Sequence, residues 1–223
     1  MIIRRIIFRT VSFLFHPVLS IGKNILLGTS FSGTKGNVLQ LKRSLIKRSD
    51  IEFKGEGNTI DAGRCSLCNT SIFIRGKGHR LVIGDDCQLF NLRIKIIGEN
   101  NLVYIGDRSA IDGGNLISGG KGTQVKLGED CMISEGLDLW STDTHSVLKD
   151  GSLKNPSKSI IIGNHVWIGK DVAILKGVTI GDNSIVGMRS LVTKDIRPGT
   201  LNVGSPSKEI HSGVNWSKKN PNN

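Results

Sequence analysis

One histidine stands at a break in an otherwise regular sequence. His145 lies in the segment LWSTDTHSV, residues 139–147, where a run of evenly spaced aliphatic residues ends. An imidazole titrates near neutral pH and can accept the proton of a hydroxyl group that attacks an acyl carbon. Asp143 and Asp138 precede it, and either carboxylate, or a backbone carbonyl, could orient the ring. These residue types predict general-base chemistry in this segment.

The chain after this break follows a six-residue repeat. From Ile162 it divides into the hexads IGNHVW, IGKDVA, ILKGVT, IGDNSI, VGMRSL and VTKDIR. The first position of each hexad is aliphatic, and glycine often follows it. An α-helix cannot keep a residue on one face at six-residue steps, whereas short strands joined by tight corners can. The repeat predicts a triangular coil of about 18 residues, with one aliphatic side chain per strand pointing inward.

The same pattern continues towards the N-terminus with a longer period. The motifs IGDDC, IGDRS and LGEDC begin at Ile83, Ile105 and Leu127, 22 residues apart, and a Gly-rich corner precedes each. Four small residues fall on the same step: Cys65, Cys87, Ser109 and Cys131. Cys65 and Cys68 form a CxxC motif, but no second one completes a zinc site, so we interpret the four small residues as buried groups stacked one per coil. Free buried thiols also fit a reducing compartment.

The hexad pattern fails at position 145. Leu127, Ile133 and Leu139 are successive inward positions, and residues 141–159 are then polar and rich in turn formers. A long loop inside a compact repeat is usually functional. We therefore expect an extended loop that leaves the coil and carries His145. His165, at a later corner, is expected to face solvent.

Composition favours an anionic partner. The net charge is +11, and the chain lacks an aromatic-interleaved basic motif of the kind that binds RNA. We therefore expect an acidic glycan, an anionic lipid or a phosphorylated cofactor, and no nucleic acid.

Residues 1–54 form a basic N-terminal segment. Aliphatic residues recur there at helical spacing: Ile3, Ile7, Val11, Leu14 and Val18. Arg5 and Arg9 take the opposite face, and Pro17 ends the predicted helix. This helix is either a cap that packs on the coil or another subunit, or an anchor on an anionic membrane surface. Arg9 interrupts the apolar run, which argues against a signal peptide, and no stretch is long enough to span a membrane.

The stretch IIIGNHVWIGKDVAILKGVTIGDNSIVGMRSLVTKDIRPGTLNVGSPSKEI resembles the bacterial hexapeptide-repeat acyltransferases. The likeness is strong over residues 140–210 and looser back to about residue 55. It is greatest for the branch that contains galactoside, maltose and xenobiotic acetyltransferases and the O-acetyltransferases of surface polysaccharides. The resemblance implies an all-β, left-handed parallel β-helix over residues 55–206, followed by a C-terminal tail, residues 207–223. It also implies a homotrimer that binds acetyl-CoA between neighbouring subunits, with no metal.

The resemblance also implies roles for single residues. The catalytic histidine of the family lies on the loop that leaves the coil, which matches His145. Trp167 matches a residue at the acetyl-CoA site, although a subunit contact would equally explain an exposed tryptophan. Lys194 and Lys208 match positions that meet CoA phosphates, or are ordinary solvated lysines, and the backbone at Gly204 and Ser205 matches the segment near the pantetheine arm.

The expected activity is therefore transfer of an acetyl group to a sugar hydroxyl. The acceptor would be a bacterial surface polysaccharide or its lipid-linked precursor, and the enzyme would be cytoplasmic, at or near the inner face of the membrane. The alternatives are a small-molecule acetyltransferase, a zinc β-helix enzyme similar to carbonic anhydrase, and a non-catalytic β-helix. The zinc alternative lacks a convincing third histidine, and the loop argues against the non-catalytic one.

Overall fold

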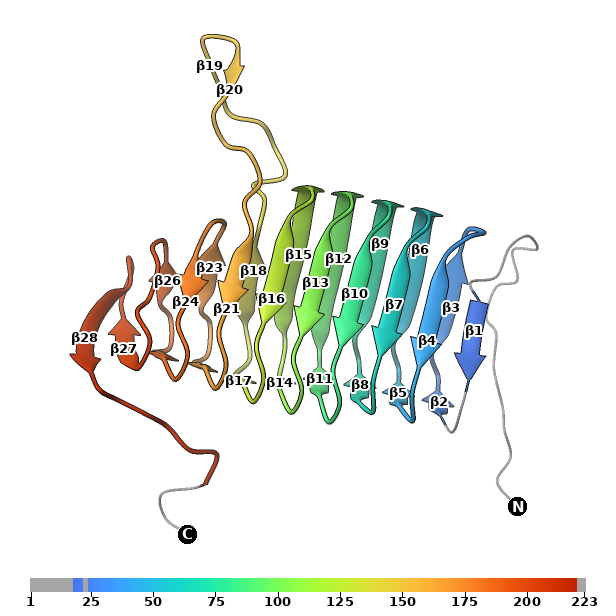
Figure 1. Ribbon diagram of the computed structural model, residues 1–223, viewed down its shortest axis with the longest axis horizontal. Helices are drawn as coiled ribbons and strands as arrows, with labels where there is room; N and C mark the ends of the chain where they lie inside the picture. The colour runs from blue at the N-terminus through green and yellow to red at the C-terminus, as the bar shows by residue number, and fades with distance from the viewer. Residues whose placement is uncertain (1–17, 22–23, 220–223) are drawn as a thin grey trace.

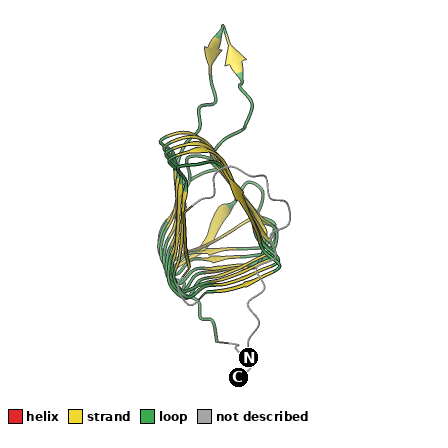
Figure 2. Ribbon diagram, turned by 90° about the vertical axis from the view of Figure 1, so that its right-hand side faces the viewer, coloured by secondary structure: helices red, strands yellow, loops and turns green. Residues whose placement is uncertain are grey.

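The computed structural model describes residues 18–21 and 24–219, so the helix predicted for residues 1–17 lies outside the described ranges. In those ranges the chain contains strands and no helix. The strands stack as a three-sided parallel β-solenoid, which confirms the predicted architecture (Figures 1 and 2). Each coil contributes one short strand to each face.

The first face consists of β1 (Val18–Ile21), β4 (Val38–Leu41), β7 (Thr59–Ala62), β10 (Arg80–Ile83), β13 (Leu102–Ile105), β16 (Gln124–Leu127), β21 (Ile160–Ile162) and β24 (Thr179–Ile180). The second face consists of β2 (Ile25–Leu27), β5 (Leu45–Lys47), β8 (Ser66–Cys68), β11 (Gln88–Phe90), β14 (Ala110–Ile111), β17 (Met132–Ile133), β22 (Trp167–Ile168), β25 (Ile185–Val186), β27 (Thr200–Val203) and β28 (Lys208–Ser212).

The third face consists of β3 (Ser30–Gly33), β6 (Asp50–Glu56), β9 (Ser71–Lys77), β12 (Leu92–Glu99), β15 (Gly114–Lys121), β18 (Leu137–Trp140), β23 (Ala173–Leu175) and β26 (Leu191–Val192). Strands within the three faces pair in parallel, except that β28 is antiparallel to β27. A separate hairpin joins β19 (Leu148–Lys149) and β20 (Ser152–Leu153).

The core is a column of aliphatic side chains, as the hexads predict. The leading residues are at most 2% exposed: Ile162, Ile168, Ile174, Ile180, Val186 and Val192. Burial of each such side chain stabilises the fold by roughly 1.5–3 kcal/mol. Because the strands are short, this column and the backbone ladders between coils hold the solenoid together.

The small residues on the 22-residue step are buried, as predicted. Cys65, Cys87 and Cys131 are free thiols. Ser109 takes the equivalent position in the coil between those of Cys87 and Cys131. Burial raises the pKa of each of these three thiols to about 11. Such thiols stay protonated at neutral pH, which fits a packing role and not a nucleophilic one.

The solenoid begins earlier than the expected boundary at residue 55. Val18 pairs with Val38, and Val38 pairs with Thr59, so the first two coils contain 20 and 21 residues. The pairing of residue 18 onward places most of the predicted N-terminal segment in regular coils. These lengths match neither the 18-residue nor the 22-residue period, which is why a repeat at constant spacing does not reveal them.

The coils with a 22-residue period depend on glycine at one corner of the third face. Gly76 and Gly98 have φ angles of 128° and 108° and are aligned in neighbouring strands. A Cβ atom on Gly98 would lie 2.0 Å from the carbonyl oxygen of Gly120. Only glycine permits this approach.

The loop after β18 leaves the corner between the third and first faces, as predicted. Figures 1 and 2 show it rising from the stack, with the β19–β20 hairpin at its tip. The stack resumes at β21, whose residues from Ile160 to Ile162 pair with β16, so the solenoid closes beneath the loop.

Candidate active site

His145 lies in the lower part of this loop and is exposed. Its backbone N–H donates to the carbonyl of Asp143 at 2.7 Å, across Thr144, whose φ is 61°. This tight turn lies within five residues of the end of β18, so the exposed His145 is close to the junction of the loop with the solenoid. The histidine therefore occupies the place expected for it, outside the aliphatic column.

Asp143 clamps the loop to the solenoid. Its carboxylate accepts hydrogen bonds from Lys176 Nζ at 2.5 Å and from Asn155 Nδ2 at 2.7 Å. Lys176 follows β23, and its side chain is 17% exposed. The bonds from Lys176 and Asn155 lower the pKa of the Asp143 carboxyl, so it is ionised at neutral pH. The clamp is a charged contact between the loop and the next coil.

Asn155 is the centre of this network. Its Nδ2 also donates to the His145 carbonyl at 2.8 Å, and its Oδ1 accepts from the Val147 N–H at 2.6 Å. Its own carbonyl accepts from Lys176 Nζ at 3.1 Å. The backbone around His145 is thereby fixed from the opposite strand of the loop. Asn155 could not be singled out from the sequence, because an asparagine in a polar, turn-rich loop carries no distinguishing pattern.

Neither carboxylate proposed to orient the imidazole is bonded to it. Asp143 Oδ2 accepts from both Lys176 and Asn155, and Asp138 Oδ1 accepts from Asn115 Nδ2 at 2.9 Å. In the described part of the chain no hydrogen bond links either carboxylate to the His145 ring. Asp143 is instead connected to the backbone of His145 through the side chain of Asn155.

Trp167 begins β22 and faces outward from the second face, where it is 37% exposed. Its ring lies 6.3 Å from that of Trp216, at an interplanar angle of 45°. The expectation that His165 faces solvent is wrong: its ring stacks on Trp216 with centroids 4.2 Å apart. Trp216 comes from the C-terminal segment, which has no repeat pattern to place it.

The other predicted donor-site residues lie at the C-terminal end of the stack. Lys194 is exposed at the corner after β26, and Lys208 is exposed at the start of β28. Gly204 has φ 101° and donates its N–H to Ser190 Oγ at 3.1 Å, while Ser205 is exposed and precedes a cis proline. Among the described residues no hydrogen bond or ion pair connects these residues with His145.

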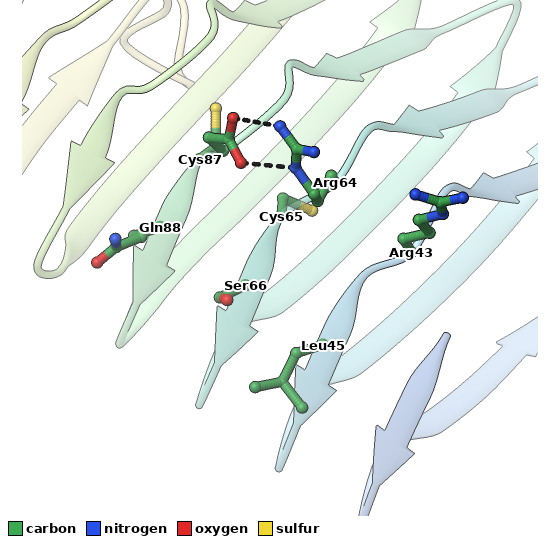
Figure 3. Close-up of a pocket in the computed structure, with 8 residues that line it drawn as sticks. Arg43, Leu45, Arg64, Cys65, Ser66, Cys87 and Gln88 are labelled. Carbon is green, nitrogen blue, oxygen red and sulfur yellow. Dashed lines mark hydrogen bonds and ion pairs between the residues drawn. The ribbon is translucent and has the colours of Figure 1, made fainter. Parts of the chain in front are cut away.

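A shallow pocket lies on the second face, at β5, β8 and β11 (Figure 3). Arg64 spans part of it and pairs with the carboxylate of Asp86 through Nε at 2.7 Å. Two of the thiols with raised pKa, Cys65 and Cys87, contribute to its lining. Strands β14 and β17 separate this pocket from Trp167, so it is not part of the candidate site.

Over residues 18–21 and 24–219, no group of three histidine, cysteine, aspartate or glutamate side chains is arranged to hold a metal ion. The same ranges contain no helix long and apolar enough to cross a membrane.

Comparison with known proteins gives consistent matches. The family model "Bacterial transferase hexapeptide (six repeats)" matches residues 159–194. The polysialic acid O-acetyltransferase of Neisseria meningitidis is 30% identical over 148 residues, which cover 56% of this chain and 68% of that protein. The galactoside O-acetyltransferase of Escherichia coli K12 is 43% identical over 89 residues, which cover 39% of this chain and 43% of that protein.

Similarity to a solved structure extends over nearly the whole chain. The crystal structure of the polySia-specific acetyltransferase NeuO superposes with a TM-score of 0.79 and 26% identity. The superposition covers 88% of this chain and 90% of the other. The similarity in architecture therefore covers a larger share of this chain than either sequence match does.

Proposed function

Because the chain belongs to the bacterial hexapeptide-repeat acetyltransferases, we propose that it uses acetyl-CoA to O-acetylate a sugar hydroxyl of a bacterial surface polysaccharide or its lipid-linked precursor. One observation carries this proposal: a clamped loop leaves the solenoid at the break in the repeat and presents His145. The names of the polysialic acid relatives support a polysaccharide acceptor. The net charge of +11 supports an acidic one.

In this proposal His145 is the general base. A ring nitrogen accepts the proton of the sugar hydroxyl while its oxygen attacks the thioester carbonyl carbon. The tetrahedral oxyanion then collapses, the carbon–sulfur bond breaks, and the imidazolium returns the proton to the departing thiolate. The products are an acetyl ester and the CoA thiol. A positioned base contributes roughly 10²–10⁴-fold to such a step.

Asp143, Asn155 and Lys176 supply the positioning. A base must stay within hydrogen-bond reach of the hydroxyl, and a freely moving loop would not hold it there. The Lys176 ammonium anchors Asp143, and Asn155 connects that carboxylate to the backbone of His145. We assign Asp143 to this indirect role in the catalytic site.

We further propose a homotrimer in which acetyl-CoA lies between subunits. His145 stands on a loop outside its own stack and Trp167 lies on a separate face, and in a trimer a second copy would bring such groups together. Trp167, Gly204 and Ser205 would line the donor site, and Lys194 and Lys208 would meet the CoA phosphates. The side chains of Lys194 and Lys208 are both exposed, so they are accessible to the phosphates.

The proposed location is cytoplasmic, with the N-terminal segment as the candidate contact with the membrane. Its basic character fits an anionic lipid surface, where a lipid-linked saccharide would be presented.

The experiment that tests this function is an acceptor screen. The purified protein is incubated with acetyl-CoA and bacterial cell-envelope oligosaccharides, acidic and neutral, and each product is measured by mass spectrometry. We expect an acidic oligosaccharide to gain one acetyl group and the His145→Ala protein to give none. Acetylation of small xenobiotic acceptors alone would contradict the polysaccharide assignment.

A further inference from the structure

The chain beyond β28 turns back along the solenoid. We call residues 213–219 the C-terminal strap. The Val214 N–H donates to the Gly199 carbonyl at 3.0 Å, and Lys218 Nζ contacts Asp130 Oδ1 at 2.6 Å. Gly199 and Asp130 belong to different coils, so the strap crosses several of them. In Figure 1 this red segment runs from β28 towards the middle of the stack.

Trp216 anchors the centre of the strap. It is 9% exposed and stacks on the His165 ring with an interplanar angle of 9°. Its indole N–H donates to the His165 carbonyl at 2.7 Å, and its own carbonyl lies 3.1 Å from His165 Nε2. Asp130 Oδ2 contacts the other ring nitrogen at 2.7 Å. Stacking and reciprocal hydrogen bonds therefore fix the indole on the corner that leads into β22.

Trp216 also lies beside Trp167, which follows His165 by two residues. The two indole rings are 6.3 Å apart and inclined at 45°, within the range of favourable aromatic pairs. Trp167 keeps 37% of its surface exposed. Trp216 therefore limits the orientations open to Trp167 from one side and leaves part of its surface free for a ligand.

We propose that the C-terminal strap is a positioning element of the acyl-donor site, in which Trp216 holds Trp167 in the orientation that receives acetyl-CoA. This inference rests on the proposed function, because it takes Trp167 as a donor-site residue. Trp216 acts through Trp167 and not on the reacting atoms. The strap would thus set the affinity for the donor without affecting acceptor binding or the chemical step.

The test compares three variants in the full-length protein. Trp216→Ala removes the ring, Trp216→Leu keeps apolar bulk without an aromatic face, and Trp216→Phe keeps a ring without the N–H. The matched control is Arg197→Ala, which breaks the paired contacts of Arg197 with Glu209 on β28 and leaves the strap residues unchanged. For each protein, CoA affinity is measured by calorimetry, kinetics give kcat and both KM values, and thermal unfolding gives the Tm.

Trp216→Ala and Trp216→Leu are expected to raise the Kd for CoA and the KM for acetyl-CoA by about 3- to 10-fold, the size of one lost aromatic contact. Acceptor KM and kcat should stay within about 2-fold, and Trp216→Phe should recover most of the affinity. Arg197→Ala should bind CoA normally, even if its Tm falls.

Normal CoA affinity in folded Trp216→Leu protein would overturn the strap proposal and leave the proposed function standing. An equal loss of CoA affinity in the Arg197→Ala control would also overturn the strap proposal, because general loosening of the C-terminal region would then explain the effect of the Trp216 variants. If the wild-type protein bound no CoA, the proposed function itself would fail, and the strap proposal with it.

Discussion

Replacement of Asn155 by alanine removes the centre of the loop network. Three side-chain hydrogen bonds disappear, those to the Asp143 carboxylate, to the His145 carbonyl and from the Val147 N–H. Each contributes about 0.5–1.5 kcal/mol net, and the lower value applies in a loop that is largely exposed. The ordered state of the loop therefore loses about 1.5–2 kcal/mol, equivalent to roughly 10- to 30-fold in the equilibrium constant between the ordered and disordered loop.

If His145 is the base, kcat should fall by more than about 2-fold and by up to roughly 10- to 30-fold, because fewer molecules present the imidazole correctly. The solenoid closes beneath the loop through the pairing of Ile162 with Leu127, so the Tm should change little. Release of CoA thiol, followed with a thiol-reactive dye, measures kcat. Peptide hydrogen exchange at residues 143–155 measures loop order independently.

Two variants sharpen this result. Lys154→Ala alters the neighbouring exposed side chain and should leave both kcat and exchange unchanged. Asn155→Asp keeps the shape but loses both amide N–H bonds and places a second carboxylate beside Asp143, so it should be at least as impaired as Asn155→Ala. A kcat within 2-fold of wild type in Asn155→Ala, with faster loop exchange, would refute the claim that loop order positions His145.

Two further predictions concern the solenoid core and the clamp. Ile174→Asp should prevent soluble folding, since it places an unpaired carboxylate in the aliphatic column at a cost above about 4 kcal/mol, whereas Ile174→Val should cost only about 0.5–1.5 kcal/mol by chemical unfolding. The Asp143 pKa is lowered by its bonds from Lys176 and Asn155, so the clamp is fully present above the ordinary aspartate value, about 3.9, and is lost as pH falls through the lower folded-state value. Limited proteolysis of the loop should therefore be equally slow at pH 7 and pH 5 and faster only at more acidic pH. Lys176→Met should show faster cleavage already at pH 7. The ion pair that it removes stabilises the ordered loop by at most about 1 kcal/mol, because the Asp143 side chain is half exposed.

The aliphatic column was predictable because each inward position repeats at fixed spacing. Position 145 was identifiable for the same reason. The repeat calls for an aliphatic residue there, three hexads after Leu127, but a histidine occupies it, and Ile162 is the residue that pairs with Leu127. The buried cysteines follow from the 22-residue step. These features depend on local period and burial, and both are visible in residue type.

Other features could not be predicted because they depend on contacts without a period. The stacking of His165 on Trp216 joins residues 51 apart through a segment that crosses several coils. Asn155 forms its network because the two strands of one loop meet, and its residue type alone does not indicate this. The first coils, which pair residue 18 onward, vary in length and hide their repeat.

The central claim is that His145 is the base of an acetyl transfer, and one paired measurement tests it most directly. Wild type and His145→Ala are compared for steady-state transfer of acetyl groups to an active oligosaccharide acceptor and for CoA binding by calorimetry. The expected result is a loss of kcat of at least about 100-fold, with an unchanged Kd for CoA and an unchanged Tm. Turnover within a few-fold of wild type in the folded, CoA-binding variant would contradict the assignment.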